Sequence, residues 1–327
     1  MTDVRPLVET THTIRGETYR LAVLRGRDLE MMAPLLREVF GPRGFTPEWV
    51  RRKYSYEREG RQAFACLAFA DDGRPVAVVG ALPWPIRHGN RSEVATQLAD
   101  CATAPAHRGR GLHARLIDLV HKVSAAAGMT FVFRFSNELA FKITTSKLGY
   151  TPLDDLVEFN VPVRTVWAER VARRTGLGRP YDRHVRQVIE PYVDSGAPLA
   201  SSVLADGYAG VDRDAAFFEY KAAFEGSRVL NLDGARVWLR ARQGLLVGDM
   251  DAGSDDELDQ GLDSLVRIAR KLGAHRVLFQ VSPGTRLCRY LETRLIRTKT
   301  RHVSCFDLGS KIPSDALRFT FGDIDTF

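Results

Sequence analysis

The sequence has 327 residues, with 47 lysines and arginines against 40 aspartates and glutamates, a net charge of +7 and 44% hydrophobic residues. This length suits two domains of roughly 100–200 residues, and the composition excludes a largely disordered chain. The longest apolar stretch, 76–86, is interrupted by Pro83 and Pro85 and is shorter than the roughly 18 residues that a membrane span needs. Because no apolar signal region follows the start, we expect a cytoplasmic protein without a membrane span.

Apolar periodicity predicts alternating strands and helices in the first domain, 1–163. A strand at 19–25 is followed by helices at 27–40 and 47–54. Three strand-like runs, at 63–70, 76–83 and 94–103, predict an antiparallel meander. The domain ends with a helix from about Arg110, a strand at 130–135, a helix at 137–148 and a strand at 156–163.

A basic connector, 164–200, follows the first domain, with two amphipathic helices. Its segment 164–186 holds seven arginines against only Glu169 and Asp182. Such a segment could attract RNA, an anionic polymer or a membrane surface. We favour a solvated helical face, because no aromatic residues alternate with the arginines as in proteins that bind single strands, so nucleic acid is only an alternative partner.

The last segment, 201–327, repeats the pattern of the first domain. Its predicted helices lie at 212–224, 255–272 and 286–293, and its predicted strands at 229–231, 235–241, 245–250, 276–281 and 302–308. A shift of 146 residues places Leu119 on Leu265, Phe133 on Phe279 and Val157 on Val303 without a gap. The two halves are therefore interpreted as a duplication.

Two glycines and two arginines precede the helix that begins near Arg110, in the segment Arg108-Gly-Arg-Gly-Leu-His113. Unpaired N–H groups at a helix start carry partial positive charge, and glycines let a backbone approach an oxygen-rich ligand. The segment thus predicts a pyrophosphate site, with an ordinary glycine turn as the alternative. The same shift places Arg108-Gly-Arg-Gly111 on Ser254-Asp-Asp-Glu257, whose charges would repel a phosphate.

These residues resemble the GNAT superfamily of acyl-CoA-dependent N-acyltransferases, whose pyrophosphate loop reads Arg/Gln-x-x-Gly-x-Gly/Ala. Arg108 and Gly111 fit that pattern, whereas His113 replaces the usual Gly or Ala. Asn137 after the next strand, with Gly149-Tyr150 twelve residues later, is similar to the strand-Asn-helix-Gly-aromatic segment of the family. The resemblance covers about 18–163. It implies an α/β fold with a mixed sheet and two tandem GNAT-like domains, the second degenerate, as in mycothiol synthase and the Fem-type peptidyltransferases.

The resemblance also implies acetyl-CoA or another acyl-CoA as co-substrate, with an amine-bearing acceptor as the other partner. The residues expected to bind coenzyme A are Ala102, Thr103, Arg108, Gly109, Arg110, Gly111, Leu112, His113 and Asn137. No metal is expected. Cys66, Cys101, Cys288 and Cys305 lack ligand spacing and are read as buried thiols.

A proton acceptor is needed because a protonated amine cannot attack a thioester. The family commonly uses a carboxylate on the strand that enters the loop, and Asp100 and Glu93 are available there. Asp100 is the candidate catalytic residue, since it lies nearer the loop; its alternative role is capping or pairing with a loop arginine. The family's tyrosine acid is missing, because the helix after Asn137 offers only the hydroxyls of Thr144, Thr145 and Ser146.

Three functions are compatible with this sequence. The leading hypothesis is transfer of an acetyl or other short acyl group to a primary amine of a small molecule or saccharide, with the second domain closing the acceptor cleft. The missing tyrosine leaves a noncatalytic coenzyme A-binding module as an alternative. The tandem layout and the basic connector leave a third, a Fem-like transferase that takes its donor from aminoacyl-tRNA. The acceptor, the acyl chain length and the oligomeric state stay open.

Overall fold

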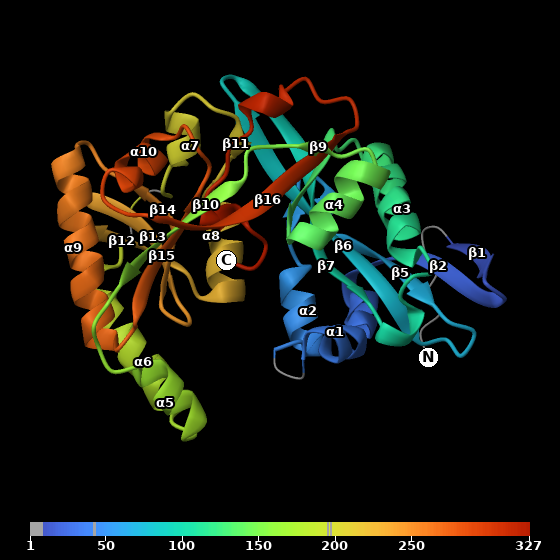
Figure 1. The fold of residues 1–327 in the computed structure, drawn as a ribbon, viewed down its shortest axis with the longest axis horizontal. Helices are drawn as coiled ribbons and strands as arrows, with labels where there is room; N and C mark the ends of the chain where they lie inside the picture. The colour runs from blue at the N-terminus through green and yellow to red at the C-terminus, as the bar shows by residue number, and fades with distance from the viewer. Residues whose placement is uncertain (1–8, 42–43, 195, 197) are drawn as a thin grey trace. The chain divides into compact units, whose positions relative to one another are not determined.

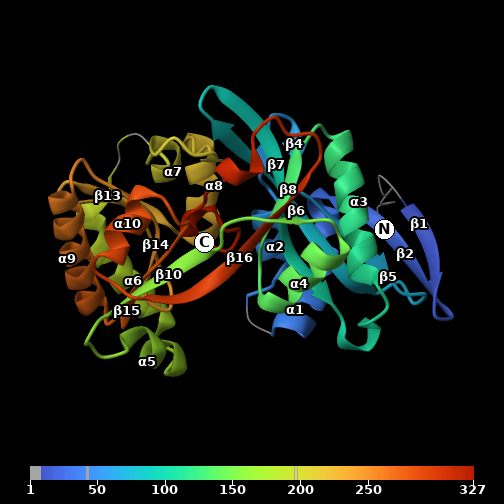
Figure 2. The same cartoon turned by 45° about the horizontal axis from the view of Figure 1, so that its top comes forward.

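The computed structural model describes residues 9–41, 44–194, 196 and 198–327, which divide into two compact units. The first unit combines the described residues up to Ile86 with Ser92–Pro152 and Ser304–Lys311. The second consists of Arg87–Arg91, Leu153–Val303 and Ile312–Phe327. Figure 1 shows both units with their elements labelled, and Figure 2 shows them from a second direction.

The first unit is built on a mixed sheet with helices packed against it. Its strands follow the order β1-β2-β5-β6-β7-β8, and the end of β16 comes next to β8. The elements are β1 (Glu9–Ile14), β2 (Glu17–Arg25), η1 (Gly26–Met32), α1 (Ala33–Phe40), α2 (Pro47–Lys53), β3 (Glu57–Arg58), β4 (Arg61–Gln62), β5 (Phe64–Phe69), β6 (Pro75–His88), β7 (Arg91–Thr103), η2 (Pro105–His107), α3 (Leu112–Ala126), β8 (Phe131–Ser136), α4 (Glu138–Lys147) and β9 (Thr151–Pro152).

Sequence periodicity placed most of these elements, with three departures. The helix expected at 27–40 is a 3₁₀ segment, η1, followed by α1, because the ring of Pro34 cannot continue a helix already under way. Helix α3 begins at Leu112 instead of Arg110, since Gly111 adopts a left-handed conformation. Strand β1, rich in Thr and without apolar alternation, was not predicted.

The second unit has a similar mixed sheet, with strand order β12-β13-β14-β15-β10-β16. Helix α9 packs on β12 to β15. The elements are β10 (Leu156–Pro162), α5 (Ala168–Arg174), α6 (Gly178–Ile189), η3 (Glu190–Tyr192), α7 (Ser202–Ala205), β11 (Gly210–Val211), α8 (Ala215–Glu225), β12 (Arg228–Leu232), β13 (Ala235–Ala241), β14 (Leu245–Asp251), α9 (Asp255–Leu272), β15 (Arg276–Val281), α10 (Arg286–Glu292), β16 (Arg297–Asp307), η4 (Ser314–Ala316) and η5 (Phe321–Asp323).

The last strands of the two expected domains are exchanged between the units. Strand β10, which we expected to close the first domain at residue 163, pairs antiparallel with β15 and with the first part of β16 in the second unit. The end of β16 instead pairs with β9 of the first unit, Ser304 opposite Pro152. The boundary differs from the prediction because chain order does not determine which edge a strand joins.

Each unit contains a parallel strand pair, and the second strand of each pair stops pairing at a corresponding residue. Strand β7 pairs with β8 at Thr96↔Val132 and Gln97↔Phe133. Strand β14 pairs with β15 up to Val247↔Phe279. Phe133 and Phe279 are separated by the same shift of 146 residues that aligns the two halves of the sequence. This agreement supports the expected duplication.

Candidate functional site

The loop before α3 has the backbone geometry of an anion site. Gly109 and Gly111 both have φ of +73°, and a Cβ added to either would meet nothing within 4 Å. Among the described residues, the amides of Gly109, Arg110 and Gly111 donate no backbone hydrogen bond, and no side chain caps α3. Unsatisfied N–H groups beside open space at a helix N-terminus can receive a phosphate.

The two arginines of the loop have different surroundings. The Arg110 guanidinium forms an ion pair with Glu17 Oε1 at 2.5 Å and donates to the Ala106 carbonyl. Hydrogen bonds from Tyr19 and Arg110 lower the pKa of Glu17. Arg108 is exposed, and its Nε donates to the Thr103 carbonyl at 3.2 Å. Arg108 therefore has donors left for a ligand, whereas Arg110 holds the loop to β2.

Strand β7 separates from β8 just before the loop. Among the described residues, its parallel pairing with β8 is confined to Thr96 and Gln97. Asp100 then has a φ of +48°, a conformation that interrupts a regular strand. Ala102 and Thr103 follow at the end of β7, and the amide of the next residue returns to Val76 of β6. The strand edge beyond Gln97 is thus available to an extended ligand.

Asp100 is held by two donors from α2 and its C-terminal end. Lys53 Nζ and Tyr54 Oη each lie 2.9 Å from its carboxylate oxygens. The side chains of Lys53 and Asp100 are 0% and 7% exposed, so this is a buried ion pair. Gly80 makes room for it, since a Cβ there would lie 1.8 Å from Tyr54 Oη. Asp100 thus pairs with a lysine of α2.

Glu93, the other candidate carboxylate, forms hydrogen bonds with the late segment of the chain that belongs to this unit. It accepts hydrogen bonds from Thr130 Oγ1, Ser310 Oγ and the amide of Lys311. The last two donors belong to Ser304–Lys311, which the first unit includes. This network assigns Glu93 a structural role.

His113, in the first turn of α3, faces a buried cation on β8. Burial and the charge of Arg134 lower the pKa of His113 to about 4, so its ring is neutral at pH 7. Arg134 is 5% exposed, and its Nε and Nη1 are buried without a hydrogen-bond partner. Asn137 Oδ1 caps α4 by accepting from the Ala140 amide at 2.9 Å. His107 lies 2.9 Å from Tyr19 Oη, behind the loop.

The hydroxyls of α4 do not replace the missing tyrosine. Thr144 Oγ1 donates to carbonyls of its own helix, as does Thr145 Oγ1, and Thr144 is fully buried. Tyr150, at the end of this segment, lies 2.8 Å from His121 Nε2, and burial raises its pKa. The hydroxyls of Thr144 and Thr145 are thus engaged within their own helix.

The corresponding helix start in the second unit is already satisfied. Ser254 caps α9 by accepting from the Glu257 amide, and Glu257 Oε2 accepts from the amides of Gly253 and Ser254. Of the positions that correspond to Gly109, Arg110 and Gly111, the Glu257 amide is thus occupied by the cap, and the first turn adds the charges of Asp255 and Asp256. These carboxylates and that of Glu257 disfavour a phosphate at this helix start.

The chain's last described segment fills the gap between β14 and β15. Thr320 bridges to Val281, and η5 contacts both strands. Arg213 anchors the segment through buried ion pairs with Asp249 and Asp323, at 2.5 and 2.8 Å. Gly248 makes room for Phe327, which a Cβ would approach to 2.6 Å. The space that a cofactor arm would need in the second unit is thus taken.

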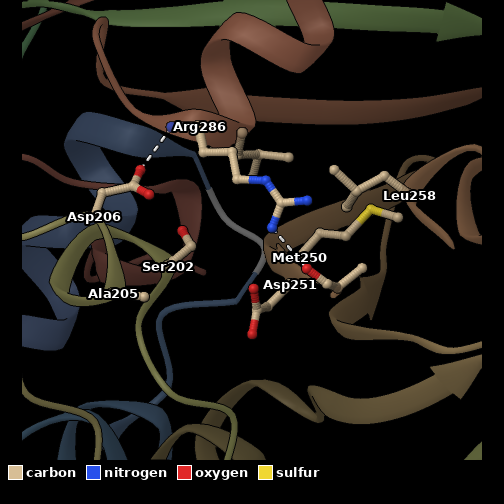
Figure 3. Close-up of a pocket in the computed structure, with 9 residues that line it drawn as sticks. Ser202, Ala205, Asp206, Met250, Asp251, Leu258 and Arg286 are labelled. Carbon is tan, nitrogen blue, oxygen red and sulfur yellow. Dashed lines mark hydrogen bonds between the residues drawn. The ribbon is translucent and has the colours of Figure 1, made fainter. Parts of the chain in front are cut away.

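A cavity of about 240 Å³ remains near the starts of α9 and α10. Figure 3 shows Arg286 crossing it between Asp206 and Asp251. The Arg286 guanidinium donates to the Ala252 carbonyl at 2.7 Å and its amide to Asp206. Burial, together with the charge of Asp249, raises the pKa of Asp251. The cavity is therefore no substitute for a phosphate site.

The described ranges 9–41, 44–194, 196 and 198–327 contain no group of three or more His, Cys, Asp or Glu side chains arranged to hold a metal ion. They also contain no helix whose length and apolar character would let it cross a membrane. All four cysteines are free thiols; Cys66, Cys288 and Cys305 are buried, and Cys101 is partly exposed.

Comparison with known proteins agrees with this geometry. Residues 20–152 match the model of the acetyltransferase (GNAT) domain. No curated protein matches the sequence. A GCN5-related N-acetyltransferase from Kribbella flavida is 16% identical, with a TM-score of 0.57 over 88% of this chain and 71% of that chain. One from Anabaena variabilis is 13% identical, with a TM-score of 0.54 over 88% and 73%. A putative acetyltransferase from Pyrococcus horikoshii is 13% identical, with a TM-score of 0.53 over 93% and 94%.

The class is therefore that of mixed α/β proteins with the GNAT fold. Residues 20–152 form a GNAT acetyltransferase domain, which assigns this part of the chain to the GNAT superfamily.

The sequence did not predict several residues that shape the site. Lys53 and Tyr54 lie 47 and 46 positions from Asp100, and Glu17 precedes a strand start. No local pattern links them to the loop. Arg134 did carry a signal, since it is the one charge in the strand Phe-Val-Phe-Arg-Phe-Ser.

Proposed function

We propose that the protein is an acyl-CoA-dependent N-acyltransferase that transfers an acetyl or other short acyl group to a primary amine of a small molecule or saccharide. The observation that carries this proposal is the loop at 108–112. It combines two left-handed glycines, unpaired amides, an uncapped helix start and the exposed Arg108. The pyrophosphate of coenzyme A suits this combination of donors and charge.

The remaining contacts of the thioester are assigned to the separated edge of β7. An extended pantetheine arm can pair with backbone groups beyond Gln97, as an added strand would. The free amine attacks the carbonyl carbon, the C–N bond forms and the C–S bond breaks. The nitrogen loses a proton to solvent, and the coenzyme A thiolate takes up a proton. With Thr144 bonded to its own helix, we assign that proton to solvent.

For Asp100 we propose a positioning role. Its carboxylate already accepts hydrogen bonds from Lys53 Nζ and Tyr54 Oη. The ion pair instead holds the interrupted part of β7 against α2. The positioning role and the catalytic role predicted from the sequence lead to different expected effects of Asp100→Asn. A positioning residue affects the melting temperature and the KM for the donor, whereas a base affects kcat and removes a pKa from the pH–rate profile.

The transfer itself is tested by release of thiol from acetyl-CoA in the presence of a panel of amines, with mass spectrometry of the products. We expect turnover with at least one primary amine and a mass increase of one acyl group. Arg108→Ala should raise the KM for acetyl-CoA. Tight binding of coenzyme A without turnover across the panel would instead support the noncatalytic module, which the occupied hydroxyls of α4 favour.

We also propose that the two units are two copies of one fold and that only the first binds coenzyme A. The matched ends of the parallel pairs, at Phe133 and Phe279, support the duplication. The capped start of α9 and the segment around Thr320 support the loss of the second site. In the connector, Arg173 of α5 already pairs with Asp182 of α6, which favours a solvated helical face over a tRNA site.

A further inference from the structure

Arg134 is a buried cation for which the proposed reaction gives no role. The residue is 5% exposed, and its Nε and Nη1 atoms are buried without a hydrogen-bond partner. Removing a guanidinium from water without pairing it is costly, so such a side chain is rarely kept without a reason. A ligand with a negative charge would offset the cost of burying the guanidinium.

The polar groups near Arg134 in the described part of the chain do not neutralise it at Nε and Nη1. Ser136 follows two positions later on the same face of β8, and its Oγ is also buried without a partner. His113 lies above in α3, and burial together with the charge of Arg134 lowers its pKa to about 4. A neutral ring neither repels an incoming anion nor neutralises it. Arg134 and Ser136 thus present unused polar atoms on one face.

Arg134 lies at the closed end of the separation between β7 and β8. The last paired residues are Gln97 and Phe133, and Arg134 is the next residue of β8. The loop at 108–112, where the proposed function places the pyrophosphate, follows the other end of β7. An arm that runs along β7 from the loop therefore brings its acyl end, and the acceptor that attacks it, toward Arg134. This step rests on the proposed function.

We propose that Arg134 binds a carboxylate of one of the two reactants. The carboxylate belongs either to the acyl group, as in a dicarboxylic acyl-CoA, or to the acceptor, as in an amino acid. The planar fork of a guanidinium matches the two oxygens of a carboxylate. Ser136 Oγ offers one further donor on the same face. The amides at the start of α3 supply donors for the coenzyme A phosphates, and the affinity for free coenzyme A distinguishes those phosphates from the carboxylate as the ligand of Arg134.

The test measures binding by calorimetry on the full chain, so that no acceptor needs to be known in advance. The donor arm compares succinyl-CoA with butyryl-CoA, which lacks the charge. The acceptor arm compares amino acids with their methyl esters in the presence of saturating coenzyme A. Each arm is run on the unaltered protein, on Arg134→Met and on Arg27→Met. Arg27 is an exposed arginine of the same unit and serves as the matched control.

We expect the charged ligand to bind 10- to 100-fold more tightly in one of the two arms, the range for a hydrogen bond to a charged group. Arg134→Met should abolish that preference, keep the affinity for free coenzyme A within about twofold, and leave the melting temperature undiminished because an unpaired buried charge is removed. Arg27→Met should behave like the unaltered protein. The arm that shows the preference identifies the source of the carboxylate.

Two results would overturn the inference while the proposed function stands. One is equal affinity for charged and uncharged ligands in both arms. The other is a loss of affinity for free coenzyme A in Arg134→Met as large as that for the charged ligand, which would assign Arg134 to the phosphates. Failure of the unaltered protein to bind coenzyme A would instead contradict the proposed function itself.

Discussion

Buried polar residues of the first unit determine what its site can do. Lys53 and Asp100 neutralise each other, Arg110 and Glu17 fix the loop, and Arg134 keeps a charge without a hydrogen-bonded partner at Nε and Nη1. Sequence reasoning located Asp100 and the loop because their neighbours in the chain define a strand end and a helix start. It could not supply their partners, since Lys53 is 47 positions from Asp100 and nothing local indicates the contact.

At the residue scale, His121 should make stability depend on pH. Burial lowers its pKa to about 4 from a usual 6.5, and its Nε2 lies 2.8 Å from Tyr150 Oη. Below pH 6.5 His121 binds a proton in the unfolded chain but not in the folded chain. The free energy of unfolding therefore falls as the pH drops toward 4. Because the ring is partly exposed, we expect this group to contribute about 1–2 kcal/mol of loss.

Urea unfolding at pH 7 and pH 5 measures this effect. His121→Gln should lose less stability between the two values than the unaltered protein does, whatever its stability at pH 7. His184→Gln, which changes an exposed ring, is the control. Equal losses in His121→Gln and the unaltered protein would show that His121 is not the group that titrates.

At the scale of elements, α3 and α9 show how two helices of the same predicted type differ in function. Periodicity predicted both, because each has a clear apolar face, and the sequence of the α9 start already indicated that it would repel phosphate. The sequence also predicted unpaired amides at the start of α3, but it could not give the exact start at Leu112, which depends on the left-handed Gly111. The capping box at α9 follows directly from Ser254 and Glu257.

A paired substitution at the two helix starts separates stability from binding. Gly111→Ala forces a side chain into a left-handed conformation and should cost about 1–2 kcal/mol of unfolding free energy. Ser254→Ala removes a cap and should cost about 1 kcal/mol. Only Gly111→Ala should also weaken acetyl-CoA binding, because it moves the loop amides. Unchanged affinity in that variant would mean that the loop does not hold the ligand.

At the scale of the whole molecule, the exchange of strands makes the late segment Ser304–Lys311 part of the first unit. Phe306 stacks on His121, the Leu308 amide donates to the Thr130 carbonyl, and Ser310 and Lys311 donate to Glu93. The repeat in the sequence predicted two copies of one pattern, and the matching ends of the parallel strand pairs support it. The exchange itself could not be predicted, because β10 and β16 have similar alternation and either could join either sheet.

A fragment ending at residue 163 should therefore be unstable, although it contains every residue of the loop. It lacks the contacts of Ser304–Lys311 and leaves β10 without β15. We expect a low and broad thermal transition by circular dichroism, compared with the full chain. A control fragment that carries residues 304–311 on a flexible linker should recover part of the cooperativity. A fragment 1–163 that melts as sharply and as high as the full chain would contradict the importance of the exchange.

The central claim is that one coenzyme A site exists, at the start of α3, and calorimetric titration with acetyl-CoA tests it most directly. We predict one site per chain, a large loss of affinity in Arg108→Ala, and unchanged affinity in Ser254→Ala. Arg108 has donors free for the ligand, whereas the start of α9 is closed by a capping box and carries acidic side chains in its first turn. Two sites per chain, no binding, or full affinity in Arg108→Ala would contradict the account.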